Sequence, residues 1–277
     1  MKAILIPVED HSSMDAVMSC ALMLARKFGS YMEGAALGPD FTELAASDFS
    51  FSGMIFDEKT RRELLDDARR KFETFMEAQG VGRQGEPGAV CSFGWMGPVL
   101  VTDKGLGEYG RVFDLIAVGK PDNSVNAPRR QTFESALFES GRPVLIVPPL
   151  VPQTLGDCIA IAWNGSSETA RSVAFAMPLL TRARDVPVFN VPHSRLLGPT
   201  ADDLTRSLRR HGVPARTVMM GDTAKAPGAA LLEKAKMLGA DLLIKGGYTQ
   251  SRLRELIFGS VTSEILAEAD LPVLMAH

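Results

Sequence analysis

The chain of 277 residues contains one apolar pattern twice, and this internal repeat limits its fold more than any other feature. Residues 114–119 and 241–246 are both short apolar runs that begin with Asp and end with Gly. A second apolar run follows each of them, at 142–147 and at 271–276. Self-similarity over this length indicates that two copies of one structural unit follow each other along the chain.

The starts of the two halves also match, because residues 4–9 parallel residues 159–164. The offset is 155 at Ile4 and Ile159 but only 127 at Asp114 and Asp241, so the first half carries 28 extra residues. We place these most simply at 40–57. The proline-rich stretch 148–153 is too stiff and too poor in N–H donors for the interior of an element. The sequence therefore predicts two domains, 1–150 and 154–277.

Strand-like and helix-like patterns alternate in each half. Continuous apolar runs suit strands that are covered on both faces, and the second half has five, at 158–163, 186–191, 215–220, 241–246 and 272–276. Apolar residues at helical spacing separate them at 173–180 and 231–238, and 65–76 gives the clearest helix of the first half. This alternation predicts an α/β chain of two parallel, doubly wound sheets in tandem, each with helices on both faces.

Composition and charge exclude several classes of protein. The 30 basic and 33 acidic residues give a net charge of −3, which attracts neither nucleic acid nor an anionic membrane surface. No apolar run approaches the ~20 residues that a membrane helix needs, and the N-terminus turns acidic too early for a secretory signal. Cys20, Cys91 and Cys158 lie far apart in apolar segments, as buried thiols do. We therefore expect a cytoplasmic protein without disulfides or structural zinc.

A literal G-x-G-x-x-G stands at Gly105–Gly110. A dinucleotide site needs this motif after a strand and at the start of a helix. Here it follows 99–104, which we expect to be helical, and it runs into the strand at Asp114. The context is reversed, so the motif does not predict a dinucleotide site.

A second group of glycines is better placed. Gly246 and Gly247 end a predicted strand, and Gly259 and Ser260 follow shortly before a predicted helix. Ligands of open α/β sheets bind at the carboxyl ends of the strands, where glycine lets backbone N–H groups approach an anion. An equally good interpretation is that these glycines only turn the chain and allow close packing.

The other candidates are weaker. His11 follows the first strand, and we expect it to be a solvated loop residue, like the arginines at 129 and 130. Trp163 ends a strand, and we expect it to belong to the core. The aromatic residues of 40–57 suggest a lid, a partner surface or a loop pinned by its own apolar side chains. The four histidines have no metal-binding spacing.

On these motifs, both halves resemble the universal stress protein family, and the second half does so best. The resemblance implies a Rossmann-like, adenine nucleotide alpha hydrolase-like fold with a five-stranded parallel sheet in each half. Nucleotide-binding members carry an Asp at the end of the first strand and a G-x2-G-x9-G-(S/T) phosphate loop. Here Gly246 and Gly259-Ser260 match that loop, whereas Thr249 replaces its second glycine and Asn164 stands at the Asp position.

The resemblance implies a weak site for ATP or AMP in the second half, without a metal and without catalytic residues. Its expected residues are Ala162, Trp163, Asn164, Gly246, Gly247, Gly259, Ser260, Val261 and Thr262. In the first half, Glu9 stands at the Asp position and Arg130-Gln131 stand where Gly259-Ser260 lie. We therefore expect no nucleotide in the first half.

The resemblance further implies a stress-response regulatory or binding module. The alternative is a slow adenine-nucleotide-hydrolysing enzyme, an ATPase, for which only Glu255 and Glu264 lie near the expected loop. Members of the family typically dimerise through the last strand of the sheet. We therefore expect Val144–Val147 and Val273–Ala276 to pair as a pseudo-dimer within the chain, with a homodimer of two chains as a further option.

Overall fold

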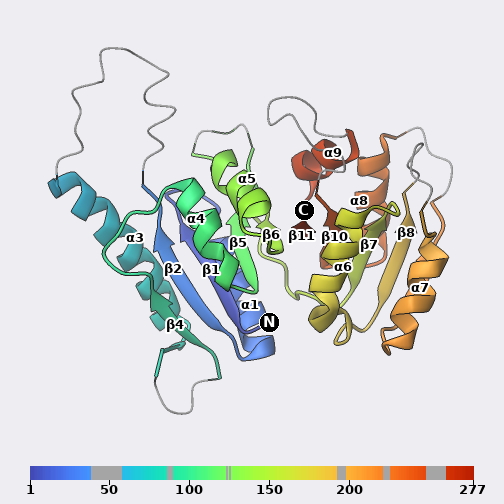
Figure 1. Cartoon of the computed structure of the whole chain (residues 1–277), viewed down its shortest axis with the longest axis horizontal. Coiled ribbons are helices and arrows are strands. Elements are labelled where there is room, and N and C mark those ends of the chain that lie inside the picture. Colours follow the sequence, from blue (N-terminus) through green and yellow to red (C-terminus); the bar gives the residue numbers. More distant parts are fainter. Residues whose placement is uncertain are drawn as a thin grey trace.

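An eleven-stranded sheet runs through the part of the chain that the structure describes (Figure 1). The computed structural model describes residues 1–38, 58–85, 90–122, 124, 126–191, 198–220, 225–247 and 260–277. Within these ranges the strand order is β3-β4-β2-β1-β5-β6-β11-β10-β7-β8-β9. Helices cover both faces of the sheet. The α/β class that the alternating pattern predicts is confirmed.

The strands and helices of the two halves follow one another in the same order, except that the first half has an additional short strand and a 3-10 turn. In the first half they are β1 (Ala3–Val8), α1 (Met14–Phe28), β2 (Tyr31–Ala36), α3 (Glu58–Ala78), β3 (Gly82–Arg83), β4 (Ser92–Trp95), α4 (Asp103–Tyr109), the 3-10 turn η2 (Gly110–Val112), β5 (Leu115–Gly119), α5 (Arg130–Glu139) and β6 (Val144–Val147). In the second half they are β7 (Ile159–Trp163), α6 (Ser167–Leu180), β8 (Val186–Asn190), α7 (Ala201–Arg210), β9 (Ala215–Val218), α8 (Pro227–Met237), β10 (Leu242–Gly246), α9 (Ser260–Glu268) and β11 (Val273–Ala276).

Each half has the topology of a doubly wound sheet. The order β4-β2-β1-β5-β6 in the first half repeats as β9-β8-β7-β10-β11 in the second. The strands within each half pair in parallel, whereas β6 and β11 pair antiparallel, with Val273 opposite Ile146 and Met275 opposite Val144. The order of strands reverses between β1 and β5 and between β7 and β10. Ligands of such sheets bind where the order reverses, at the carboxyl ends of the strands.

The two halves differ at their outer edges. The predicted strands of the second half are found within two residues of their expected ends. The expectation of five strands is wrong for the first half, because the two-residue strand β3 adds a sixth beside β4. Helix α3 has 21 residues and its counterpart α7 has 10, so the helix supplies part of the extra length. The expected insertion at 40–57 lies outside the described residues.

The G-x-G-x-x-G stretch lies in a helix rather than in a loop. The expectation that 99–104 is helical is wrong for its first residues, since Val101 bridges to Leu37 and α4 begins only at Asp103. Gly107 packs so closely on α5 that an added Cβ would lie 2.6 Å from the carbonyl oxygen of Ser135. Gly107 therefore serves the packing of α4 on α5.

The repeated Asp, which precedes β5 in the first half and β10 in the second, has a structural role. Asp241 is buried, and its carboxylate accepts hydrogen bonds from the backbone N–H groups of Gly156, Asp157 and Cys158 and from the Thr154 hydroxyl. Asp114 likewise accepts from the N–H groups of Lys2 and Ala3. In both halves a carboxylate thus fixes the entry of the first strand, which explains why the Asp repeats.

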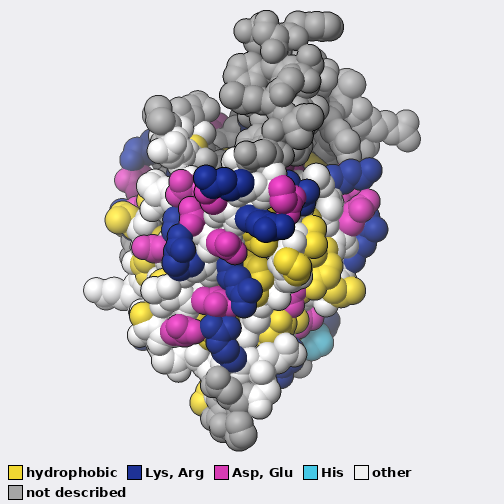
Figure 2. Space-filling view, turned by 90° about the vertical axis from the view of Figure 1, so that its left-hand side faces the viewer, with side chains coloured by type: hydrophobic (Ala, Val, Ile, Leu, Met, Phe, Trp, Pro, Cys, Tyr) yellow, Lys and Arg dark blue, Asp and Glu magenta, His cyan; other side chains and the backbone are white. Residues whose placement is uncertain are grey.

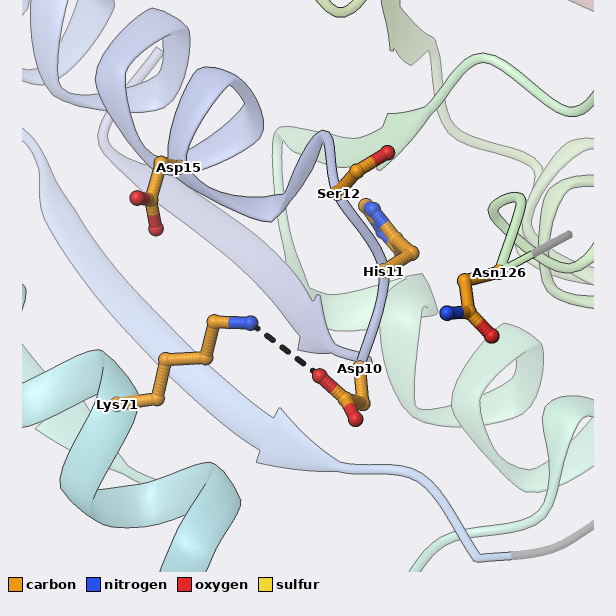
Figure 3. Close-up of a pocket in the computed structure, with 6 residues that line it drawn as sticks. All are labelled: Asp10, His11, Ser12, Asp15, Lys71 and Asn126. Atoms are coloured by element: carbon orange, nitrogen blue, oxygen red, sulfur yellow. Dashed lines mark ion pairs between the residues drawn. The ribbon is translucent and has the colours of Figure 1, made fainter.

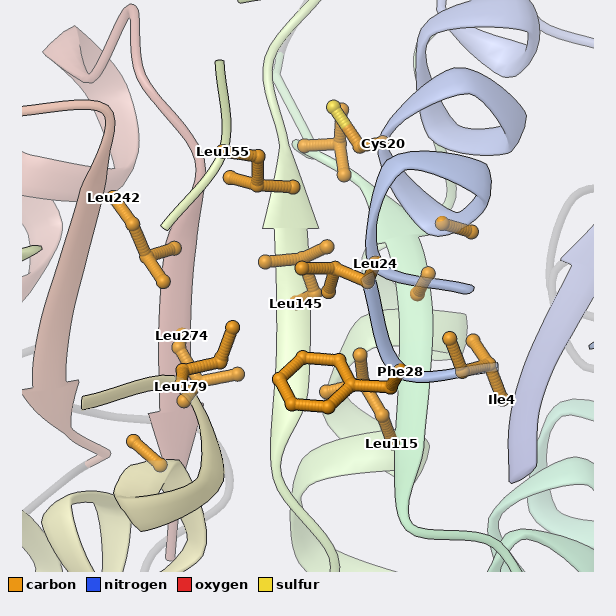
Figure 4. Close-up of a cluster of buried hydrophobic side chains, with 14 of the residues drawn as sticks. Ile4, Cys20, Leu24, Phe28, Leu115, Leu145, Leu155, Leu179, Leu242 and Leu274 are labelled. Carbon is orange, nitrogen blue, oxygen red and sulfur yellow. The ribbon is translucent and has the colours of Figure 1, made fainter. Parts of the chain in front are cut away.

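The hydrophobic core is continuous across the joint between the halves (Figure 4). On one face of the sheet, Leu24 and Phe28 of α1 pack with Leu145 of β6, Leu274 of β11 and Leu179 of α6. A second cluster covers the opposite face, under α4, α5, α8 and α9. All three cysteines are buried and free, as expected from their apolar surroundings.

Polar contacts also join the halves. The ammonium of Lys27 in α1 donates to the carbonyl oxygens of Leu155 and Gly156 and pairs with Asp157 at 2.9 Å. The guanidinium of Arg182 lies 4.5 Å from the ring centre of Phe28. These contacts lie in the same region as the shared apolar core, so the joint has a packed interior and a polar surface.

The outer edge of the first half is strongly charged. Figure 2 shows acidic and basic side chains interspersed over this face. Helix α3 contributes several of them, and Arg83 of the edge strand β3 pairs with its Glu73 and Glu77. Charged side chains on an edge strand oppose pairing with further strands.

Candidate functional site

The ends of β7 and β10 meet the first turn of α6, where the sequence predicts the nucleotide site. Asn164 follows β7, and its side-chain oxygen accepts from the N–H of Ser166 at 3.1 Å and from the Thr169 hydroxyl at 2.7 Å. Ser166 caps α6 by accepting from the N–H of Thr169. The oxygen of Asn164 is therefore already engaged in the start of α6, and its NH₂ group is the donor left for a ligand.

Gly246 ends β10 in close contact with α6. A Cβ at this position would lie 2.4 Å from the backbone nitrogen of Thr169, so only glycine fits. The N–H of Gly247 donates to the carbonyl oxygen of Ala276 at 2.7 Å, and a Cβ there would lie 3.3 Å from Leu137 of α5. Packing alone thus accounts for glycine at Gly246, as the alternative interpretation of the sequence holds, and Gly247 connects the site to the first half.

Helix α9 begins at Ser260, opposite the end of β10. Thr262 in its first turn is 6% exposed, and its hydroxyl accepts a hydrogen bond from the ammonium of Lys245 at 2.6 Å. Lys245 also donates to the carbonyl oxygen of Gly246 at 3.1 Å. Burial lowers the pKa of Lys245 to about 8. Sequence reasoning missed this lysine, because its place in an apolar strand gives no sign of where its side chain ends.

The other expected site residues fall into two groups. Ala162 and Trp163 are 3% and 4% exposed and belong to the core, and the indole N–H of Trp163 donates to the carbonyl oxygen of Pro199. Trp163 is therefore a core residue, as expected. Val261 packs against the core beneath α9. Gly259 and Thr249 lie outside the described residues, as does the side chain of Ser260.

The equivalent position in the first half holds its own ion-pair network. Glu9 is 7% exposed, and its carboxylate accepts from the backbone N–H of Arg129 at 3.0 Å. The guanidinium of Arg129 donates to the carbonyl oxygen of Gly38 at 2.7 Å and lies 3.7 Å from Asp103. Thr132 in the first turn of α5 donates to Asp103 at 2.6 Å. The expectation that Arg129 is solvated is wrong, because the buried carboxylates draw its side chain inward.

A hollow of about 390 Å³ lies beside this network (Figure 3). Asp10, His11, Ser12 and Asp15 line it from the β1–α1 connection and the start of α1, with Lys71 of α3 on one side and Asn126 on the other. His11 is 6% exposed, so the expectation of a solvated histidine is wrong. Its ring packs close to Gly119, where an added Cβ would lie 2.9 Å from Cε1.

The protonation of His11 follows from this burial. Its Nδ1 accepts from the N–H of Ser13 at 3.1 Å. Burial, and next to it the charge of Lys71, lower the pKa of His11 to about 4, although Asp10 acts in the opposite direction. The imidazole is therefore neutral near pH 7, with Nε2 as its donor.

Two features are absent from the residues that the structure describes. None of their His, Cys, Asp and Glu side chains form a group of three or more that could hold a metal ion. No helix among them is both long enough and apolar enough to span a bilayer.

The second half also matches known proteins in sequence. Residues 159–277 match the model of the universal stress protein family. A segment of 49 residues is 41% identical to the stress response protein NhaX of Bacillus subtilis (strain 168). That segment covers 18% of this chain and 30% of the length of NhaX.

The fold of the whole chain also has solved counterparts. A universal stress protein from Archaeoglobus fulgidus DSM 4304 matches with a TM-score of 0.71 at 16% identity, over 99% of this chain and 97% of that one. A functionally unknown protein from Pseudomonas aeruginosa PAO1 matches with a TM-score of 0.56 at 15% identity, over 100% of this chain and 92% of that one. The family match thus covers residues 159–277, and the first half repeats the strand order of the second.

Proposed function

We propose that this protein is a stress-response binding module whose second half holds an adenine nucleotide, ATP or AMP, weakly. The nucleotide would lie at the carboxyl ends of β7 and β10, with its phosphates between Gly246-Gly247 and the start of α9 at Gly259-Ser260-Val261. The observation that carries the proposal is the contact between the end of β10 and the first turn of α9, through Lys245 and Thr262, at the point where the strand order reverses.

Two departures from the family pattern weaken the proposed site. Thr249 replaces a glycine of the phosphate loop, which costs ~1 kcal/mol if that position needs a positive φ. Asn164 lacks the charge of the Asp that the family carries, which costs roughly another 1 kcal/mol. Together they reduce affinity about thirtyfold, because each ~1.4 kcal/mol is a factor of ten. We therefore expect dissociation constants well above the micromolar range.

We propose a structural role for the first half. Glu9 and Arg129 satisfy each other there, and α5 begins at Arg130 where the second half has small residues. An entering phosphate would have to displace Arg129 from Glu9, Asp103 and the carbonyl oxygen of Gly38. This half would act as the internal partner of the second, through the β6–β11 pairing.

Slow hydrolysis is the alternative function. It needs a carboxylate that can position a water molecule or a metal ion. The carboxylate of Glu264 accepts from the N–H of Gly228 at 2.7 Å, which ties α9 to α8. Glu255 lies outside the described residues. The engagement of Glu264 favours binding over hydrolysis, and phosphate release from ATP under steady-state conditions tests this directly.

The test of the binding function is calorimetric titration of ATP into three full-length proteins. Gly259→Trp places an indole in the expected phosphate loop, and we expect it to weaken ATP binding at least tenfold. Arg130→Trp places the same indole at the counterpart position of the first half and should leave binding unchanged. Equal affinity of the wild type and Gly259→Trp would move the nucleotide to another site. Absence of binding to the wild type at millimolar ATP would refute the nucleotide function.

A further inference from the structure

Lys245 is a buried cation at the end of β10. Its side chain is 8% exposed, and its ammonium donates to the Thr262 hydroxyl and to the carbonyl oxygen of Gly246. None of the ion pairs formed by the described residues includes Lys245. An ammonium has three N–H donors, so two neutral acceptors satisfy part of its donor capacity and none of its charge.

The surroundings of Lys245 are electropositive as well. Its ammonium contacts the first turn of α9, where the helix dipole places partial positive charge. The first turn of α6 lies against the other side of the strand end, at Gly246. Burying a charge without an opposite partner is costly, and a second positive field raises that cost. An anion at this position would offset the cost of burying the charge and the effect of the helix dipoles. The pKa of Lys245 is lowered because its charge is buried without such an anion.

At the equivalent position of the first half, carboxylates of the chain itself balance the positive charge. Val118 of β5 takes the place of Lys245, so this half has no cation in the strand. Thr132, which like Thr262 is the third residue of its helix, donates to the carboxylate of Asp103 instead of accepting from a lysine. The nearby cation, Arg129, faces Glu9 and Asp103. Both halves thus place the start of a helix over the end of a strand. The cation of the first half, Arg129, faces carboxylates, whereas Lys245 of the second half has no carboxylate partner among the described residues.

We propose that Lys245 is a phosphate-binding residue that contacts the polyphosphate chain of the ligand from beneath the first turn of α9. The proposal deepens the nucleotide function and rests on it for the position of the ligand. The chemistry it predicts is shared by ATP and by inorganic polyphosphate, since the ammonium recognises phosphate oxygens and no part of the base.

The experiment compares ATP, inorganic triphosphate and adenosine as ligands of the full-length protein by calorimetry. Lys245→Met keeps the length of the side chain and removes its charge, and Lys245→Arg keeps the charge. Lys236→Met, at an exposed lysine of α8, is the matched control. We expect Lys245→Met to bind ATP and triphosphate about tenfold to a hundredfold more weakly, while Lys245→Arg retains most of the affinity and Lys236→Met all of it. Adenosine should bind the wild type and Lys245→Met equally.

A second measurement separates ligand contact from a purely structural role. Carbon-13 NMR of the lysine ε-methylene groups follows the titration of Lys245 in the wild type. Saturation with inorganic triphosphate should raise the pKa of Lys245 from about 8 towards its ordinary value near 10.5. This measurement needs no variant, so it decides the matter even if Lys245→Met fails to fold.

The outcomes distinguish this proposal from the nucleotide function. If ATP binds the wild type and Lys245→Met equally, or if ATP binds while the pKa of Lys245 stays unchanged at saturating triphosphate, the role of Lys245 is refuted and the nucleotide function stands. If triphosphate binds through Lys245 and ATP does not bind, the role of Lys245 stands and the nucleotide function fails. If neither binds at millimolar concentration, both are refuted.

Discussion

His11 shows at the scale of one residue how burial sets a charge. Its pKa is lowered to about 4 in the folded protein, whereas an unfolded histidine has a pKa near 6.5. Between pH 6.5 and 4 the unfolded chain therefore takes up a proton that the folded chain does not. The free energy of unfolding must fall as the pH is lowered through this window and become level again below pH 4.

We predict that His11→Asn removes this part of the pH dependence. Asn offers an oxygen in place of Nδ1 for the N–H of Ser13, and it does not titrate. Relative to the wild type, the variant should gain on the order of 2 kcal/mol between pH 7 and pH 4.5, after allowance for screening at the rim of the hollow. Urea unfolding at pH 7, 6, 5 and 4.5 measures the difference. His211→Asn, at an exposed histidine, should keep the wild-type slope, and an unchanged slope in His11→Asn would contradict the assignment.

Individual residues also show where sequence reasoning succeeds and where it stops. Asn164 and Gly246 can be placed from spacing alone, because an apolar run fixes the end of a strand and the ends of parallel strands share one edge. Lys245 and Arg129 could not be placed, since a long flexible side chain ends several ångströms from its backbone. Which carboxylate or helix it meets there depends on tertiary packing.

At the scale of elements, the repeated Asp sets the start of the first strand in each half. Asp241 is 8% exposed and serves four donors from the 154–158 segment, whereas Asp114 is exposed and serves two. Replacement of a carboxylate oxygen by NH₂ places a donor where an acceptor faced the buried N–H groups. Such a mismatch costs about 1–3 kcal/mol when the donors lose their partner in a buried position, and less where water reaches them.

We therefore predict that Asp241→Asn lowers the free energy of unfolding by about 2 kcal/mol or more, and that Asp114→Asn lowers it by under about 1 kcal/mol. The two substitutions are chemically identical, so each serves as the control for the other. Urea denaturation at pH 7 gives both values. A loss of equal size at the two positions would mean that burial does not set the cost of this anchor.

The elements at the outer edge of the first half were harder to predict than those of the centre. Strands β7 and β10 are continuous apolar runs because helices cover both of their faces, and such runs are plain in the sequence. Phe72 and Met76 are the buried side chains of helix α3. Because the apolar stripe is so short, it predicts a helix shorter than the 21 residues that are observed. Strand β3 has two residues, too few for any alternation to be recognised.

At the scale of the molecule, the two halves share one sheet and one hydrophobic core. The pairing of β6 with β11 makes the sheet continuous, and Leu145 and Leu274 pack together beneath α1 and α6. We propose that this internal contact serves as the dimer contact of the family. A shared core also has a consequence for folding, since neither half can lose its packing without exposing apolar surface of the other.

We predict that the two halves unfold in one cooperative transition. The chain has two tryptophans, Trp95 in β4 of the first half and Trp163 in β7 of the second, so Trp163→Phe and Trp95→Phe each leave a fluorescent reporter in one half. The urea curves of the two reporters should coincide when each is compared with the far-UV signal of its own variant. Two separate midpoints within one variant would mean that the halves unfold independently.

Lys27→Met, introduced into both reporter variants, tests the same coupling at the joint. It removes the hydrogen bonds of α1 to the carbonyl oxygens of Leu155 and Gly156 and the ion pair with Asp157, and it should cost about 1–2 kcal/mol because the group is largely buried. Since the contact joins the halves, the midpoints at Trp95 and Trp163 should fall together. Lys59→Met, at an exposed lysine of α3, should shift neither by more than about 0.5 kcal/mol. A shift of the urea midpoint at only one reporter would show that Lys27 stabilises one half alone. The proposal that the internal dimer contact couples the folding of the two halves would then be wrong.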